Sequence, residues 1–274
     1  MPRQKSTPPH PPGTHLVLVD EKDRQYLIQV PEPGRVLRLK GENLDQETVA
    51  GLHDGQLLVT PHHRRYLVFL PTMEQLVMNM PREAQVIYPK DQALLLFYGD
   101  VAPGMEVIEV GVGHGAFSMA LLRALGPDGR LLSYDLRLDH LNRTRKNIGL
   151  YLGPEYLERW EPVLADPIAE GFGGHTCDRL FTDIPEPWQL ITPAAEAIAP
   201  GGIWAAYIPT VLQLMQQMEA LSAERCFCLP TSFETLQRYW HARHPSVRPK
   251  HTMRGHTGFI VTGRRRWLPP AQPD

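Results

Sequence analysis

The sequence predicts an α/β protein in which a small β-rich domain precedes a Rossmann-like, doubly wound parallel sheet. Between Met105 and Leu221, short apolar runs alternate with segments of helical periodicity, which is the pattern of successive βαβ units. Between residues 14 and 75, short β-type runs are separated by turn signals. The chain has 274 residues and is 42% hydrophobic, which suffices for one large domain or for one domain and a smaller one.

The first part of the chain is expected to hold a disordered tail and the β-rich domain. Residues 1–13 are rich in proline, serine and threonine and are expected to be disordered. Residues 14–75 are expected to form strands over His15–Asp20, Gln25–Val30, Arg35–Lys40, Gln56–Thr60 and Tyr66–Leu70. The basic run His62-His63-Arg64-Arg65 is either a contact for a polyanion or a solvated loop.

The second domain is expected to span residues 76–266, with residues 267–274 as a tail. A short helix is expected over Thr72–Met80 at the junction. Pro89 disfavours helical backbone at Tyr88, so Tyr88 is expected at the mouth of a loop, before a helix over Gln92–Gly99. The alternative for Tyr88 is a packed core tyrosine.

The alternating region gives the order of the sheet elements. Strands are expected over 105–110, Arg130–Asp135, Glu161–Ala165, Arg179–Asp183 and Ile203–Pro209, and helices over 115–125, 138–151, 189–199 and Thr210–Leu221. The runs Cys226–Phe233 and Thr257–Gly263 are expected to be antiparallel edge strands. Ligands of such sheets bind beyond the carboxyl ends of the strands.

A glycine-rich loop follows the first strand of the alternating region. The apolar run Val107–Val110 contains Glu109, and Gly111-Val112-Gly113-His114-Gly115 leads into a helix. Glycines let the backbone approach a ligand closely, and a helix N-terminus offers free N–H groups. Alone, this pattern fits an ordinary strand-to-helix turn equally well.

Carboxylates at the strand ends favour one nucleoside cofactor over another. Glu109 would repel a pyrophosphate but suits the α-ammonium of S-adenosylmethionine. Asp135 ends the second strand, where a carboxylate suits ribose hydroxyls. Asp166 follows the third strand and could reach an adenine amino group. These three carboxylates together favour a class I S-adenosylmethionine-dependent methyltransferase over a dinucleotide-dependent oxidoreductase.

The run Asp183-Ile184-Pro185-Glu186-Pro187-Trp188 follows the fourth strand. Its two prolines stiffen the loop and remove backbone donors. In amino-methyltransferases a loop at this position presents an acceptor to a target amine or ring nitrogen, which makes Asp183 the candidate catalytic residue. The alternative is a stiff turn in which Asp183 caps the following helix.

Charge and cysteine content limit the classes of partner. The net charge is −2, but residues 236–273 contain no Asp or Glu and several arginines, which suggests a basic surface for nucleic acid or a solvated basic segment. The three cysteines suggest neither a disulfide framework nor a metal site. No apolar stretch reaches the length of a membrane span. We therefore expect a cytoplasmic protein without a metal or a membrane contact.

Several of these motifs together resemble those of the bacterial and archaeal tRNA adenine-N1 methyltransferases that modify adenosine 58 of the T loop, some of which also modify position 57. The resemblance covers nearly the whole chain. The matching motifs are Tyr88-Pro89-Lys90-Asp91, the glycine loop after Glu109, Asp183-Ile184-Pro185-Glu186-Pro187-Trp188, Ala206-Tyr207-Ile208-Pro209 and Gly255-His256-Thr257-Gly258-Phe259.

This resemblance implies a class I fold, a homotetramer and transfer of a methyl group from S-adenosylmethionine to tRNA. It assigns catalysis to Asp183. It assigns cofactor contacts to Glu109, Gly111, Val112, Gly113, His114, Gly115, Asp135, Asp166 and Asp183, and contacts with the target adenosine to Tyr88, Tyr207 and His256. Val112 and His114 stand where the family loop usually has hydroxyl residues. The rival hypotheses are a class I methyltransferase acting on another substrate and a non-catalytic tRNA-binding subunit.

Overall fold

The computed structural model describes residues 8–80 and 86–268, and the chain forms two compact units. The first unit comprises Met1–Pro81 together with Ile148–Pro154, and the second comprises Arg82–Asn147 together with Glu155–Asp274. No helix of the described residues is both long and apolar enough to cross a membrane. Of the two predicted tails, residues 1–7 and 269–274 lie outside the described residues.

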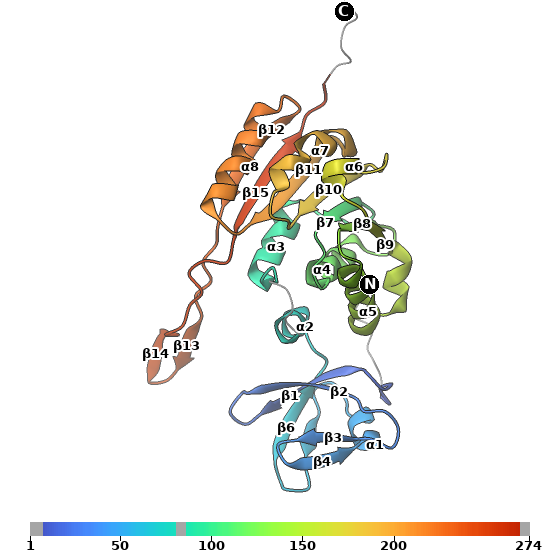
Figure 1. Cartoon of the computed structure of the whole chain (residues 1–274). Coiled ribbons are helices and arrows are strands. Elements are labelled where there is room, and N and C mark those ends of the chain that lie inside the picture. Colours follow the sequence, from blue (N-terminus) through green and yellow to red (C-terminus); the bar gives the residue numbers. More distant parts are fainter. Residues whose placement is uncertain (1–7, 81–85, 269–274) are drawn as a thin grey trace, which may run out of the picture. The chain divides into compact units, whose positions relative to one another are not determined.

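The first unit is built on a four-stranded antiparallel sheet with the strand order β2-β1-β6-β5 (Figure 1). The strands are β1 His15–Asp20, β2 Gln25–Gln29, β5 Leu57–Val59 and β6 Arg65–Phe69. Alternate side chains face one apolar core, as Tyr66 and Val68 of β6 show: they are buried, while their neighbours in β6 are exposed. All the strands predicted for this unit are present.

Two elements of the first unit escaped prediction. Strand β4 Glu42–Asp45 forms a hairpin with β3 Val36–Leu39 and leads into the short helix α1 Gln46–Ala50, whose first turn is capped by the Asp45 side chain. The short helix predicted over Thr72–Met80 is present as α2 Met73–Asn79 and begins with a capping box between Thr72 and Gln75.

The described part of the predicted N-terminal tail is packed rather than disordered. The His10 side chain is buried, and its Nε2 lies 2.8 Å from the Leu52 carbonyl oxygen. The composition of residues 8–13 resembles that of a disordered segment, but these contacts order it.

The second unit contains a seven-stranded sheet with the order β12-β15-β11-β10-β7-β8-β9 (Figure 1). Its strands are β7 Glu106–Val110, β8 Arg130–Asp135, β9 Trp160–Leu164, β10 Cys177–Thr182, β11 Ile198–Ile208, β12 Phe227–Phe233 and β15 Phe259–Arg265. Strands β9, β8, β7, β10 and β11 are parallel, whereas β15 and β12 are antiparallel to their neighbours. The doubly wound sheet is therefore confirmed.

Helices precede and connect these strands, and all except the short helix at 167–170 were predicted. They are α3 Pro89–Tyr98, α4 Ala116–Leu125, α5 Leu138–Tyr151, α6 Pro167–Glu170, α7 Ile191–Ala197 and α8 Val211–Ala223, with 3-10 turns η1 Pro154–Arg159 and η2 Pro187–Leu190. Helix α3 starts at Pro89, earlier than expected, because proline is accommodated at the first helical position, where no N–H is needed. The core is apolar and includes Ile108, Leu180 and Trp204, which are almost fully buried.

The C-terminal part differs from the expectation at two points. Strand β15 lies between β11 and β12 and is not an edge strand; it pairs with both, and its central residues Ile260 and Val261 are buried. Strands β13 Trp240–Arg243 and β14 Ser246–Pro249 form a hairpin that was not predicted. Its side chains are mostly exposed, so no alternation of apolar and polar residues marks it in the sequence.

Candidate active site

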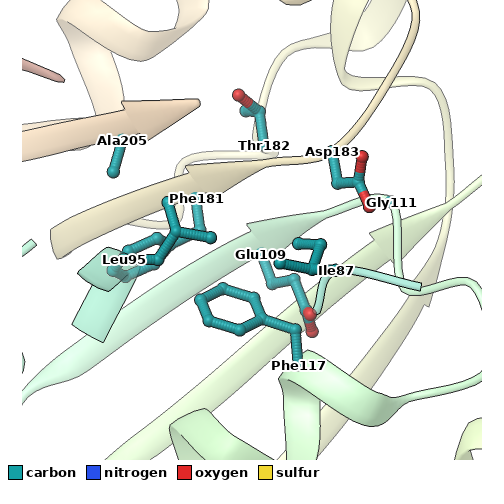
Figure 2. Close-up of a pocket in the computed structure, with 9 residues that line it drawn as sticks. All are labelled: Ile87, Leu95, Glu109, Gly111, Phe117, Phe181, Thr182, Asp183 and Ala205. Atoms are coloured by element: carbon teal, nitrogen blue, oxygen red, sulfur yellow. The ribbon is translucent and has the colours of Figure 1, made fainter. Parts of the chain in front are cut away.

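The candidate site lies where the direction of the sheet order reverses, at the carboxyl ends of the neighbouring strands β7 and β10. From β7 the chain winds outward through β8 and β9, and then returns to the other side of β7 as β10. The loops after β7 and β10 therefore diverge at a topological switch point, which is the usual ligand position in such sheets. Figure 2 shows Glu109, Gly111 and Asp183 around a common cavity at this point.

Glycine is required by the geometry of the first loop. Gly111, Gly113 and Gly115 all have positive φ angles. A Cβ atom at position 111 would lie 2.3 Å from the Asp183 carbonyl oxygen, and one at position 115 would lie 2.7 Å from Thr144 Cγ2. Gly111 thus lets the loop pass against the backbone of Asp183.

Glu109 is buried under this loop with only one oxygen satisfied. Its Oε2 accepts hydrogen bonds from Ser118 Oγ at 2.7 Å and from Ser133 Oγ at 2.8 Å. Oε1 has no hydrogen-bond partner among the described residues. Burial raises the pKa of Glu109 to about 7, partly opposed by the two serine bonds. A fixed carboxylate with one free oxygen, beside Gly111, suits a cationic ligand group or a bridging water.

Asp135 occupies the end of β8, as predicted, and ties the glycine loop to that strand. Its Oδ2 accepts a hydrogen bond from the Val112 backbone N–H at 3.0 Å and lies 3.1 Å from His140 Nδ1. Its Oδ1 accepts only the Arg137 backbone N–H, at 2.9 Å. Since a carboxylate oxygen can accept two bonds, Oδ1 keeps capacity for a ribose hydroxyl. His140 was missed by the sequence analysis.

His114 and Asp166, which were predicted to contact the cofactor, also make contacts that stabilise the local structure. His114 is buried, its Nε2 has no hydrogen-bond partner within the described residues, and burial lowers its pKa. Its carbonyl oxygen accepts a 2.8 Å hydrogen bond from Asn147 Nδ2, which fixes the loop to α5. Asp166 caps α6, because its Oδ1 accepts the Ile168 N–H at 2.9 Å.

Asp183 follows β10 directly and has a carboxylate free to act. Its backbone N–H donates to the Val110 carbonyl oxygen at 2.9 Å, so the residue is held to the end of β7. Solvent reaches its side chain, yet the surrounding protein desolvates the carboxyl enough to raise its pKa to about 7. Desolvation is the cause of that shift, and among the described residues no hydrogen bond or cation stabilises the charged form. The 3-10 turn η2 has Glu186, not Asp183, at its N-cap position, and no side-chain hydrogen bond caps it, so Asp183 does not serve as its cap.

Tyr88 lies at the N-cap of α3, directly after Ile87, which lines the cavity with Asp183. The guanidinium carbon of Arg254 lies 4.4 Å from the centroid of the Tyr88 ring, and Arg254 Nη1 donates to the Tyr88 hydroxyl. The half-buried Tyr88 is therefore neither solvated nor a core residue.

A buried polar cluster, formed by Lys90, Asp91, Tyr207, Thr235 and Thr257, fixes the start of α3 to the C-terminal part of the chain. Lys90 Nζ donates to Asp91 Oδ1 at 2.5 Å, to the Thr235 carbonyl oxygen at 2.9 Å and to Thr257 Oγ1 at 2.7 Å. Thr257 Oγ1 donates to Asp91 Oδ2 at 2.7 Å. The structure thus assigns the Tyr-Pro-Lys-Asp motif a positioning role that its sequence alone did not reveal.

Tyr207 belongs to this cluster and has a different place from the one expected for a residue stacking on a base. It is almost fully buried, and its hydroxyl donates to the Thr257 carbonyl oxygen at 2.7 Å. Its ring packs against Gly258, where a Cβ atom would lie 2.4 Å from Cζ. Tyr207 therefore holds the segment that follows His256.

His256 bridges two segments at the end of β11. Its Nε2 lies 2.9 Å from the Pro209 carbonyl oxygen, and its Nδ1 lies 2.8 Å from Glu234 Oε2. Both partners are acceptors, so the doubly protonated ring satisfies both, and the hydrogen bond to Glu234 is the main cause of its raised pKa. When protonated, His256 forms an ion pair with Glu234, so the two side chains together add no net charge beside Arg254.

The basic C-terminal segment divides into two parts. Arg264, Arg265 and Arg266 donate to backbone carbonyl oxygens of Gly201, Ala195 and Arg225, respectively. The remaining basic side chains lie on the β13–β14 hairpin and the loops beside it, and Arg238, Arg248 and Arg254 are exposed there. The second part is the one available to a polyanion.

Sequence comparisons relate this chain to tRNA-modifying proteins. Residues 65–252 match the family described as tRNA methyltransferase complex GCD14 subunit. The chain is 31% identical to the tRNA (adenine(58)-N(1))-methyltransferase TrmI of Thermus thermophilus, over 91% of this chain and 96% of that protein. It is 26% identical to the tRNA (adenine(57)-N(1)/adenine(58)-N(1))-methyltransferase TrmI of Methanocaldococcus jannaschii, over 95% and 97%.

Solved structures share the whole architecture. A Thermotoga maritima protein described as a SAM-dependent O-methyltransferase superimposes with a TM-score of 0.87 and 27% identity, over 94% of this chain and 95% of that one. The tRNA (m1A58) methyltransferase TrmI of Aquifex aeolicus gives a TM-score of 0.79 at 20% identity, over 94% and 98%. The predicted class I methyltransferase fold with an N-terminal β-rich domain is confirmed.

Proposed function

Because the chain belongs to the family described as tRNA methyltransferase complex GCD14 subunit, we propose that it methylates N1 of adenosine 58 in the T loop of tRNA. S-adenosylmethionine is the methyl donor. Adenosine 57 is a second candidate target, since the Methanocaldococcus jannaschii relative is named as a methyltransferase of both adenine 57 and adenine 58. The observation that carries the proposal is the unpartnered Asp183 carboxylate, held by the backbone of β7 beside the glycine loop.

The residues at the switch point fit this methyl donor. Glu109 keeps Oε1 free for the cationic amino-acid end, and Asp135 keeps capacity on Oδ1 for the ribose. Gly111, Gly113 and Gly115 provide the close backbone approach, with Val112 and His114 between them, and Asp166 lies after β9 for the adenine. When bound, S-adenosylmethionine supplies an electrophilic methyl group on a sulfonium.

Asp183 is the residue to which we assign catalysis. Adenine N1 is paired or stacked in folded tRNA, so the base must leave the stack to be methylated. In its ionised form, Asp183 accepts a hydrogen bond from the exocyclic N6 amine, which directs N1 toward the methyl donor. N1 gains positive charge as its bond to the methyl carbon forms and the carbon–sulfur bond breaks. The nearby carboxylate stabilises that charge and can afterwards take a proton from N6.

Tyr88 and His256 serve the nucleotide in this proposal. Tyr88, next to the cavity-lining Ile87, borders the extruded base. His256 holds the segment that follows Arg254 against the end of β11 through its hydrogen bond to Pro209. Tyr207 acts through the buried polar cluster rather than by stacking, since its hydroxyl is occupied by Thr257.

The proposal is tested by incubating the protein with unmodified tRNA and S-adenosylmethionine labelled in the methyl group, followed by mapping of the modified nucleoside. We expect N1-methyladenosine at position 58, and at position 57 if both are substrates. A tRNA with guanosine at position 58 is the control. Asp183→Ala should keep cofactor binding and reduce turnover by orders of magnitude. Turnover close to that of the wild type in this variant would remove Asp183 from the mechanism.

Phosphate contacts of the RNA are assigned to two basic regions. One is the exposed part of the C-terminal segment, around Arg238, Arg248 and Arg254. The other is a cleft of the first unit that is lined by Lys22, Arg24, Lys40, Arg64 and Arg65, and also by Asp20 and Glu21. Asp20 forms ion pairs with Arg24 and Lys40, so Lys22, Arg64 and Arg65 are the cations assigned to phosphate. The Arg64 guanidinium already forms an ion pair with Glu42, because its Nε lies 3.5 Å from Glu42 Oε1. Such contacts give salt-dependent affinity without reading sequence.

We also propose a cytoplasmic homotetramer. Trp240 and Val247 of the β13–β14 hairpin are 59% and 68% exposed, which is unfavourable for apolar side chains and suits burial between copies. Light scattering on the purified protein measures the mass directly. A monomer at working concentration would contradict this assembly without affecting the assignment of Asp183.

The main rival function is that of a non-catalytic tRNA-binding subunit. That function does not require the glycine loop or Asp183. Here Glu109 and Asp183 are both present, and the three glycines have the backbone conformation that a close ligand approach needs. These observations favour an active enzyme.

A further inference from the structure

Arg254 is an exposed cation held in a defined position without an acidic partner. Its contacts are the Tyr88 ring face, 4.4 Å from the guanidinium carbon, and the Tyr88 hydroxyl. No carboxylate of residues 8–80 or 86–268 forms an ion pair with it. A free arginine side chain would lose rotamer entropy on being held this way, so the aromatic face must compensate.

The loop that carries Arg254 is anchored on both sides. On one side, the Lys250 backbone N–H donates to the Tyr239 carbonyl oxygen at 2.8 Å. On the other side, His256 binds Pro209 and Glu234, and Thr257 belongs to the buried polar cluster. The contact at Lys250 joins the segment to the β13–β14 hairpin, and the contacts of His256 and Thr257 fix its other end, two residues from Arg254.

The carboxylates around these anchors have other partners. Glu234 is bonded to His256, and Asp91 is bonded to Lys90 and Thr257. Among the described residues, no carboxylate therefore neutralises the Arg254 charge, whereas His256 and Glu234 compensate each other as an ion pair. A pre-positioned, uncompensated cation beside a catalytic cavity is suited to an anion that arrives with the substrate.

We propose that Arg254, stacked on Tyr88, is a positioning residue that binds a backbone phosphate of the RNA strand next to the extruded nucleotide. This inference rests on the proposed function and names the residue that fixes the strand at the site. Guanidinium binds phosphate through several N–H groups in one plane, and proteins commonly use aromatic and arginine planes to hold single-stranded RNA. The stack on Tyr88 orients that plane in advance.

The test measures tRNA affinity between 50 and 200 mM salt for the wild type, Arg254→Ala and Arg254→Lys, beside steady-state kinetics. We expect Arg254→Ala to weaken tRNA binding and raise KM about tenfold or more. We also expect the slope of log affinity against log salt to fall by about 0.7 to 0.9, the contribution of one phosphate contact. Arg254→Lys should keep the slope and lose part of the affinity, because it keeps the charge but not the planar fork. Arg38→Ala, an exposed arginine of the first unit, is the matched control and should leave both unchanged.

A second measurement separates phosphate binding from mere support of Tyr88. If Arg254 only supports the Tyr88 ring, Arg254→Ala changes kcat while the salt slope stays at the wild-type value, and the proposal is overturned. An equal loss of slope in Arg38→Ala would overturn it as well. The dependence of tRNA affinity on salt can be measured even if no methyl group is transferred. If the wild type binds tRNA without methylating it, the proposed function fails while the role of Arg254 is still decided.

Discussion

Gly111→Ala tests whether the glycine loop positions Asp183. Both Gly111 and Gly201 have a φ of +87°, so alanine at either position adopts an unfavourable left-handed backbone. That conformation costs about 1 to 2 kcal/mol, of which the stiffer unfolded chain offsets part. At Gly201 nothing lies within 4 Å of the added Cβ, so Gly201→Ala should destabilise the protein by about 1 kcal/mol.

The same substitution at position 111 adds a collision. Its Cβ would lie 2.3 Å from the Asp183 carbonyl oxygen and 2.9 Å from Ile184 Cγ2. Relieving such overpacking typically costs a further 1 to 3 kcal/mol, giving a total of about 2 to 4 kcal/mol. The loop relaxes by moving Asp183, and a displacement of about 1 Å in a catalytic group can reduce turnover about a hundredfold.

Urea unfolding followed by tryptophan fluorescence is a suitable assay. All five tryptophans, at positions 160, 188, 204, 240 and 267, belong to the second unit, so the signal reports on that unit alone. Turnover is measured on the same samples under native conditions. Equal destabilisation by Gly111→Ala and Gly201→Ala, with equal turnover, would refute the steric argument.

Three further predictions concern charged groups of the site. Asp91→Asn leaves the Lys90 ammonium without its buried carboxylate partner and should reduce the stability of the second unit by about 3 kcal/mol, as measured by urea unfolding. Replacing Lys90 by Met in the same variant should restore part of the lost stability. The pH profile of kcat/KM should rise through about pH 7, because the raised pKa of Asp183 keeps the carboxyl protonated, and unable to act as an acceptor, at lower pH. The stability difference between Glu109→Gln and the wild type should grow in favour of the variant from about pH 4.5 to about pH 7 and then level off, as measured by urea unfolding at each pH.

The sign of the last effect follows from the raised pKa of Glu109. Below the ordinary glutamate pKa of 4.5, the carboxyl is protonated in both folded and unfolded states and has no effect on stability. Between that value and about 7, the unfolded chain ionises while the folded one stays protonated, so the wild type loses stability as pH rises. A constant difference between variant and wild type across this range would contradict the assigned pKa. A rising limb of kcat/KM that persists in Glu109→Gln would attribute that limb to Asp183.

The sequence predicted those parts of the fold that periodicity and turn chemistry encode locally. Strand β8 and helix α5 have the expected bounds, since each combines an apolar pattern with clear end signals. The position of strand β15 in the sheet was predicted wrongly because it depends on pairing with β11 and β12, which are distant in the sequence. The local pattern of Phe259–Arg265 contains no information about these partners. The β13–β14 hairpin was missed because its exposed, basic side chains lack the alternation of a half-buried strand.

For the site, the sequence located the strand-end carboxylates but not their partners. Glu109, Asp135 and Asp183 follow from their places at the ends of strands. The duties of Lys90 and Tyr207 could not be predicted, because they depend on Thr257, which is far away in the sequence. His140 was missed because a lone histidine on a helix carries no signal until Asp135 is placed beside it.

The position of β15 between β11 and β12 has a consequence for biosynthesis. During translation, β11 and β12 emerge first and have no hydrogen bonds to each other, since each pairs with β15. The buried polar cluster is also incomplete until Thr257 emerges, 167 positions after Lys90. A nascent chain can therefore fold its first unit early, while its catalytic sheet keeps a gap until Arg265 has left the ribosome. During that interval the unpaired edges of β11 and β12 are exposed, and that is when the protein is most open to capture by chaperones or to aggregation.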